Sequence, residues 1–336
     1  MSPGRRGLAA ALLAGVVGLS GCASWSAHQT QALLTQRPAD LPAAVEWDQV
    51  PFFPQTVNQC GPAALATALG AVGVSVPPED LTRDVFLPAR EGSLQIEMLA
   101  AVRRHGQVGT RIRPELHALL QEVAAGHAPV VLLNLGLSVA PLWHYAVVVG
   151  YDLPSGQILM RSGTTRRAWM PLATFEHTWK RSGQWAFVAL PPEVLPVAAD
   201  EDAVTEGRVA FERVAEPARA VEAYRVAWQR WPDSLVLALG RANSLYAAHD
   251  YPAAAQAYEQ VARRHDSAAA WNNLAHVRLA LGDVASALQA AEAAVRRAQT
   301  DRQWLPAAES TLATVQAAAR SSRPPQPQAP GAAGAP

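Results

Sequence analysis

The chain is poor in cysteine and carries no excess charge of either sign. Its 336 residues include two cysteines, and 28 basic residues balance 28 acidic ones. Two cysteines exclude a framework of several disulfides and offer no thiol-rich zinc spacing, so no metal site is predicted. The balanced charge predicts no nucleic-acid partner. No glycine-rich phosphate loop stands out, and no cofactor is predicted.

The N-terminus also lacks an apolar run long enough for a transmembrane helix. The run from Leu8 to Leu19 is too short to cross a bilayer. A pair of arginines precedes it, and the sequence Leu-Ser-Gly-Cys, ending at Cys22, follows it. A basic start, an apolar centre and small residues before a cleavage site are typical of an export signal.

The end of this segment resembles a bacterial lipobox. We therefore expect residues 1–21 to be a signal peptide and Cys22 to carry lipid, which anchors a protein to a membrane without spanning it. Ala23 follows the cysteine, and by the sorting rule of Gram-negative lipoproteins this resembles an outer-membrane address, facing the periplasm. An ordinary secretory signal with an incidental cysteine is the alternative.

If Cys22 is lipidated, Cys60 has no cysteine partner within the chain. A lone thiol in an exported protein is either reactive or a small buried hydrophobe. Cys60 begins the segment CGPAALATAL, which reads as a helix with Pro62 in its first turn. Free N–H groups and the helix dipole favour a thiolate at a helix start, and Gly61 leaves the approach to the sulfur open. The pattern indicates an activated cysteine.

A nucleophilic cysteine needs a base and an oxyanion donor. His144 opens the strand pattern WHYAVVVGYD and is the candidate base, although a satisfied core histidine is the alternative. Gln55 precedes Cys60 by five residues and is the candidate oxyanion donor, together with the Cys60 amide. A solvated loop glutamine is the alternative there, and Gln59 is a competing candidate.

The order of the segments predicts the fold class. Helical patterns occupy the first part of residues 50–191, and antiparallel strand patterns follow them. This segregation indicates an α+β domain. Residues 22–49 read as a tether and residues 192–202 as a proline-rich linker.

The chain then changes to an alanine-rich helical repeat. Ala220, Ala254 and Ala287 occupy equivalent places, at spacings of 34 and then 33 residues. This pattern resembles the tetratricopeptide repeat, with an ordinary alanine-rich bundle as the alternative. We expect an all-α repeat domain over 203–300 that binds a protein partner, and a disordered tail over 321–336.

The segments PQTVNQCGPAALATAL and HYAVVVGYD resemble the papain-like C39 cysteine peptidase group. The resemblance runs roughly from Pro51 to Leu190, a little under half of the chain, and implies a papain-like fold and a peptide or protein substrate. It also implies a site with glutamine, cysteine, histidine and then aspartate or asparagine in chain order, matched here by Gln55, Cys60 and His144.

Two positions depart from the pattern of this group. Gln55 lies five residues before the cysteine rather than six. Ser162 and Gly163 stand where an Asp-Pro step is expected. Ser162 can orient His144 by a hydrogen bond but supplies no charge, and Asp152 lies at a hairpin turn that points elsewhere. A Cys60–His144 dyad therefore remains, with Ser162 as the candidate orienting residue.

These features define three hypotheses. The first is an envelope cysteine peptidase anchored to a membrane through Cys22, with repeats that bind protein. The second is a catalytically weak or inactive scaffold that keeps the peptidase fold, which the missing aspartate favours. The third is a peptidyltransferase using the same dyad, as in phytochelatin-synthase-like proteins, which product analysis with an amine acceptor would separate from hydrolysis.

Overall fold

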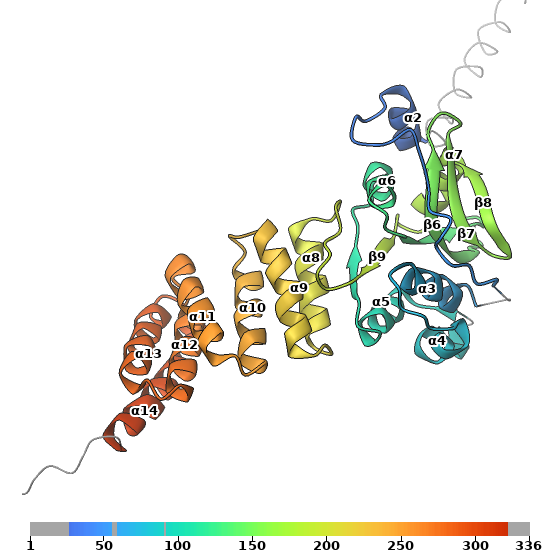
Figure 1. Cartoon of the computed structure of the whole chain (residues 1–336). Coiled ribbons are helices and arrows are strands. Elements are labelled where there is room, and N and C mark those ends of the chain that lie inside the picture. The colour runs from blue at the N-terminus through green and yellow to red at the C-terminus, as the bar shows by residue number, and fades with distance from the viewer. Residues whose placement is uncertain (1–26, 56–58, 91, 322–336) are drawn as a thin grey trace, which may run out of the picture. The chain divides into compact units, whose positions relative to one another are not determined.

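A computed structural model describes residues 27–55, 59–90 and 92–321 of the chain (Figure 1). The predicted signal peptide, Cys22 and residues 322–336 of the predicted tail lie outside the described residues. The chain divides into two compact units, residues 1–214 and residues 215–336. Across the described ranges, none of the helices combines the length and the apolar character needed to cross a membrane.

The N-terminal unit contains a seven-stranded sheet in which every pairing is antiparallel. The strand order is β4-β9-β5-β6-β7-β8, and β1 pairs with β6. A two-stranded ribbon, β2-β3, lies apart from it. The strands are β1 (Ala44–Glu46), β2 (Phe86–Leu87), β3 (Gly92–Ser93), β4 (Val108–Arg111), β5 (Val130–Asn134), β6 (Trp143–Asp152), β7 (Gln157–Ser162), β8 (Thr165–Pro171) and β9 (Ala186–Leu190).

Helices surround the sheet, and most of them come before its central strands in the chain, so the predicted α+β class is confirmed. The helices of this unit are α2 (His28–Thr35), α3 (Cys60–Ala71), α4 (Pro78–Val85), the 3-10 helix η2 (Pro88–Arg90), α5 (Gln95–Arg104), α6 (Leu116–Ala124), α7 (Leu172–Lys180) and α8 (Glu201–Glu212).

Strand β6 separates two apolar cores because its side chains alternate between the sheet faces. Ala146 and Val148 belong to the core that includes α6 and α7. Tyr145 and Val147 belong to the core that includes α3 and α5. Every residue of α3 from Gly61 to Leu69 is buried, so this helix is enclosed on all sides rather than on one face. The strand and the helix that carry the candidate site residues are therefore firmly embedded.

The structure differs from the predicted tether over residues 22–49. Its described part forms α2 and β1, and Leu33 and Leu41 lie in the core. The buried carboxylate of Glu176 accepts hydrogen bonds from the first backbone N–H groups of α2, those of Gln29 and Thr30. The contacts of this segment are made to residues far away in the sequence, between 76 and 147 positions along the chain.

The C-terminal unit is a tetratricopeptide-like array of paired helices, as predicted. Consecutive helices pack on one another from α9 to α14. The small residues that repeat in the sequence, Ala220, Ala254 and Ala287, are fully buried. The helices are α9 (Pro217–Arg230), α10 (Leu235–Ala247), α11 (Tyr251–His265), α12 (Ala268–Ala280), α13 (Val284–Ala298), the 3-10 helix η3 (Arg302–Trp304) and α14 (Leu305–Ser321).

Gly240 shows why these positions are small. A Cβ atom built there would lie 2.3 Å from the ring of Tyr224, so only glycine lets α9 and α10 approach this closely.

Two boundaries of the repeat region differ from the sequence prediction of 203–300. Helix α8 packs on β4 of the N-terminal unit, where the Arg208 guanidinium donates to Thr110 Oγ1 at 3.2 Å. The N-terminal unit accordingly extends to Val214. At the other end, α14 continues the array to Ser321 and places Val315 in its core.

Candidate active site

Cys60 is the first residue of α3, as the sequence predicts. The helix begins here because Pro62 fits the first turn, where its missing N–H costs no hydrogen bond. A Cβ atom at Gly61 would lie 2.2 Å from Ser93 Oγ. The glycine therefore allows the β2-β3 ribbon to lie against the start of the helix.

The thiol of Cys60 is half-buried, and burial raises its pKa. Backbone N–H groups of Tyr145, Gly61 and Cys60 itself act in the opposite direction and lower the pKa, but burial is the largest effect. The expectation of a thiolate stabilised by the helix start therefore needs correction. The N–H donors are present, yet desolvation outweighs them and raises the pKa of the Cys60 thiol.

The backbone hydrogen bond from Tyr145 places the Cys60 sulfur beside the peptide that joins His144 to Tyr145. His144 is partly buried near the start of β6, and its ring Nε2 lies 2.8 Å from Ser162 Oγ. Burial lowers the pKa of His144. Among the described contacts, no hydrogen bond joins the Cys60 thiol directly to the His144 ring, and hydrogen bonds of this kind are often long in unliganded enzymes.

Gln55 approaches the same segment of β6. Its backbone N–H donates to Gly163 O at 3.0 Å, which attaches it to the turn between β7 and β8. Its side-chain amide donates to Tyr145 O over 3.5 Å, a long and weak bond that leaves the amide able to turn. Gln55 and Cys60 therefore contact the backbone of Tyr145, and Ser162 contacts the ring of His144, so three separate parts of the chain meet at the start of β6.

Tyr145 is the residue that the sequence analysis missed. Its hydroxyl donates to Ser93 O at 3.2 Å, which ties β6 to the ribbon beside Gly61. Burial raises the pKa of Tyr145, and the negative charge of an ionised Cys60 raises it further. Its only signal in the sequence is its place directly after His144.

No carboxylate supports His144 within the described part of the chain. Asp152 lies eight residues along β6, where its carboxylate accepts a hydrogen bond from Ser155 Oγ at 2.8 Å. It stabilises the turn between β6 and β7. His144 therefore has a neutral hydroxyl partner in place of an anion, and nothing here offsets the cost of charging the ring.

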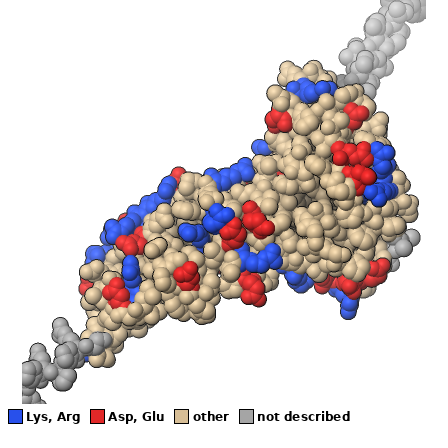
Figure 2. Space-filling model, viewed as in Figure 1, with Lys and Arg blue, Asp and Glu red and all other residues tan. Residues whose placement is uncertain are grey.

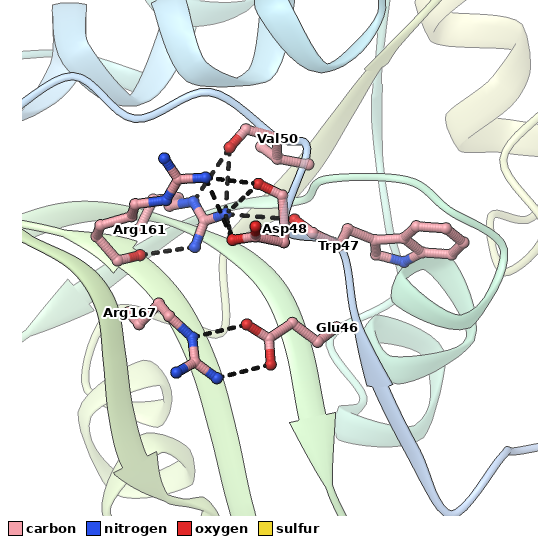
Figure 3. Close-up of polar contacts among 7 residues, drawn as sticks. Glu46, Trp47, Asp48, Val50, Arg161 and Arg167 are labelled. Atoms are coloured by element: carbon pink, nitrogen blue, oxygen red, sulfur yellow. Dashed lines mark hydrogen bonds and ion pairs between the residues drawn. The ribbon is translucent and has the colours of Figure 1, made fainter.

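Arg161, the residue before Ser162, fixes the chain that leads to Gln55. Its buried guanidinium donates to the carbonyl oxygens of Val50, Asp48 and Trp47, as Figure 3 shows. It also donates to Arg166 O at 2.7 Å. These bonds attach the segment 47–50 to β7, so the strand that carries Ser162 also positions the approach to Cys60.

Two exposed ion pairs flank this attachment. Arg167 binds Glu46 through two hydrogen bonds of 2.7 and 2.8 Å, and Arg166 lies 3.2 Å from Asp48. Figure 2 shows acidic and basic side chains side by side at this β7-β8 edge. Elsewhere in the described ranges, no three His, Cys, Asp or Glu side chains converge in a way that could hold a metal ion.

Comparison with known proteins finds one family model and several solved structures. Residues 47–187 match the model of the Peptidase_C39 like family. A structure described as a C39-like peptidase from Bacillus anthracis is 17% identical, with a TM-score of 0.38, and the match covers 44% of this chain and 98% of that one. No curated protein matches the chain.

Two further solved structures match helical regions. The Sgt2 TPR domain from Aspergillus fumigatus is 23% identical, with a TM-score of 0.33, over 40% of this chain and 91% of that one. MamA residues 41 to the end from Desulfovibrio magneticus RS-1 is 15% identical, with a TM-score of 0.28, over 37% of this chain and 78% of that one.

The N-terminal unit is thus an α+β domain with a cysteine at the start of a buried helix and a histidine on the adjoining strand. Residues 47–187 match the model of the Peptidase_C39 like family, and a tetratricopeptide-like helical region follows them.

Proposed function

We propose that the N-terminal unit is a cysteine peptidase in which Cys60 is the nucleophile and His144 the general base. The observation that supports this most directly is the position of the Cys60 sulfur, at the peptide joining His144 to Tyr145. Gln55 and the Cys60 N–H would donate hydrogen bonds to the oxyanion that forms when the sulfur attacks a peptide carbonyl.

Ser162 would hold the ring of His144 in the tautomer that catalysis requires. When Nε2–H donates to Ser162 Oγ, the lone pair of Nδ1 can accept the thiol proton. The sulfur then adds to the carbonyl carbon, and His144 returns the proton to the departing amine. Water, deprotonated by His144, hydrolyses the resulting thioester and restores the thiol.

This mechanism starts from a neutral thiol and a neutral imidazole. The pKa of Cys60 is raised and that of His144 is lowered, both by burial. Each shift opposes the thiolate–imidazolium pair, so proton transfer would accompany attack rather than precede it. We expect activity to increase toward alkaline pH.

The remaining parts of the proposal concern location and partners. The sequence ending at Cys22 supports lipidation, anchoring to a bacterial envelope membrane and an outer-membrane location facing the periplasm. The repeats would bind a protein partner, which brings a substrate or a complex to the peptidase unit.

A binding scaffold is the second candidate function. The hydroxyl partner of His144 and the raised pKa of Cys60 favour it, because a catalytic thiol usually has a lowered pKa. In this case the unit would bind a polypeptide without cleaving it.

Incubation with a peptide library distinguishes these functions. The full-length chain carrying Cys22→Ser retains one thiol, and mass spectrometry identifies new peptide termini. We expect cleavage that is lost in Cys60→Ala and strongly reduced in His144→Ala. Products joined to an added amine indicate transfer in place of hydrolysis. Binding without any product supports the scaffold and rejects the peptidase.

A further inference from the structure

An exposed apolar hairpin tip lies directly beside the candidate base. It consists of residues 135–143, which connect β5 to β6 and contain no charged residue. Its large apolar side chains are unusually exposed, at 69% for Leu137, 91% for Val139, 62% for Leu142 and 51% for Trp143. Contiguous exposed apolar groups of this kind mark interaction surfaces.

The tip has a defined backbone conformation. The buried side chain of Asn134 accepts hydrogen bonds from the backbone N–H groups of Gly136 and Leu142, both at 3.0 Å. Leu137 and Ala140 exchange two backbone hydrogen bonds of 3.2 Å. A Cβ atom at Gly136 would lie 2.4 Å from Ala140 O, so glycine is required there. The apolar side chains therefore project from an ordered framework.

The sheet register fixes this tip next to His144. Leu133 pairs with His144 and Asn134 pairs with Trp143, so the hairpin leaves the sheet one residue beyond the base. A second exposed apolar segment follows Ser93 of the β2-β3 ribbon. Leu94 and Ile96 are exposed, and they follow Ser93, whose hydroxyl lies against Gly61.

We propose that the hairpin tip binds bulky apolar side chains of a polypeptide substrate next to the bond that Cys60 attacks. This inference rests on the proposed function and specifies its substrate class. The Cys60 sulfur lies beside the peptide that joins His144 to Tyr145, and Leu142 and Trp143 directly precede this peptide in the chain, so a substrate bound at Cys60 would lie near them. Burial of apolar side chains against this surface favours apolar over polar substrates.

A lipid surface fits the tip less well. Membrane-binding segments usually combine apolar with basic side chains, and the tip has none of the latter. Insertion of the tip into a bilayer would also bring the strand end carrying His144 to the lipid surface, where a polypeptide has poor access. The uncharged tip therefore favours a polypeptide.

The test compares two peptidyl chloromethyl ketones that share one reactive group. The peptides are acetyl-Leu-Leu-Gly and acetyl-Ser-Ser-Gly, and the protein is the full-length chain with Cys22→Ser. We expect the leucine reagent to alkylate Cys60 at least ~10-fold faster, the discrimination available from a few apolar groups. Iodoacetamide, which has no peptide, reports the intrinsic reactivity of the thiol.

Substitution of the tip should remove this preference. In Leu137→Ser/Leu142→Ser the ratio of the two rates should fall toward one, while the iodoacetamide rate stays unchanged. Val214→Ser removes an apolar side chain that is 58% exposed at the far end of α8 and serves as the matched control. It should keep the wild-type ratio.

Binding of the corresponding peptide amides, measured by calorimetry, provides a readout that needs no reactive thiol. Equal rates and equal affinities for both peptides in the wild-type chain overturn the inference. So does a double variant that loses binding to anionic lipid vesicles but keeps the peptide preference. A clear preference for the leucine peptide without any peptide hydrolysis would support the apolar binding site and reject the peptidase function. The experiment therefore distinguishes failure of this inference from failure of the proposed function.

Discussion

The Nε2 atom of His144 lies 2.8 Å from the Oγ atom of Ser162, so the imidazole ring has a neutral hydroxyl as its partner. The hydrogen bond orients the imidazole ring but adds no charge. Since burial lowers the pKa of His144 and raises that of Cys60, the site holds both groups neutral. The first two predictions follow from this arrangement.

Replacement of Ser162 by aspartate should activate the thiol. A carboxylate within hydrogen-bonding distance raises the pKa of a histidine by about 1–3 units and stabilises the imidazolium. The thiolate–imidazolium pair then becomes accessible, and the rate of Cys60 alkylation by iodoacetamide at pH 6.5 should rise at least ~10-fold. Ser162→Asn is the neutral control. Equal rates in the two variants would show that the residue at 162 does not govern the charge of His144.

The wild-type alkylation rate should increase steadily with pH. An ordinary cysteine ionises near pH ~8.5, and burial raises the pKa of Cys60. The rate constant should therefore grow about tenfold per pH unit between pH 6 and 8.5, because only the thiolate reacts. His144→Ala should show the same slope. A plateau near pH 6 that disappears in His144→Ala would contradict the neutral pair.

Folding stability should decrease in mild acid because of His144. Its pKa is lowered in the folded state, so the unfolded chain binds the proton more readily below pH ~6.5. The free energy of unfolding should then fall, by at most ~1.4 kcal/mol per pH unit, until the folded state is also protonated. Denaturant titrations at several pH values should show a smaller dependence in His144→Gln. An identical dependence would exclude His144 as its source.

Substitution Gly61→Ala should destabilise the N-terminal unit. The added Cβ atom would lie 2.2 Å from Ser93 Oγ and 2.6 Å from Ser93 Cβ. Overpacking of this kind costs about 1–3 kcal/mol, to be measured as the free energy of unfolding. The second substitution Ser93→Gly removes the clash and should restore part of the stability. If the double variant is no more stable than Gly61→Ala, the contact with Ser93 is not the cause.

Arg161→Met should be more damaging than Arg167→Gln. The first substitution leaves the buried carbonyl of Val50 without its donor and removes one of two donors from the carbonyls of Trp47 and Asp48, at a cost of about 1–3 kcal/mol. The second breaks the exposed pair with Glu46 and should leave unfolding unchanged within error. Hydrogen exchange at residues 47–50 localises the effect. Comparable losses in both variants would refute the role of Arg161.

The sequence predicts the site better than it predicts its surroundings. Cys60 and His144 carry local signals, a Gly-Pro helix start and an aromatic strand. The sequence also suggested the hydrogen bond between Ser162 and His144, and the bond is present in the structure. In contrast, the pKa of Cys60 is raised because the surrounding core buries the thiol. This burial cannot be predicted from the residues that begin the helix.

The segments that the sequence analysis misplaced are those held by distant partners. Strand β1 gains its conformation from pairing with β6, and α2 is capped by Glu176. Helix α8 lies within the range expected for the repeats but packs on β4. The sequence pattern predicts a helix or strand well where segments adjacent in the sequence bury that element. The repeat helices are an example, because each packs on the next helix of the chain.

The attachment of residues 47–50 to Arg161 has a consequence for the order in which the chain folds. These contacts join positions 111–114 residues apart, whereas each repeat pairs helices that are adjacent in sequence. Contacts between distant positions slow folding because long loops must close first. The unit synthesised first should therefore be the slower one to fold, and its thiol should remain exposed until β7 is in place.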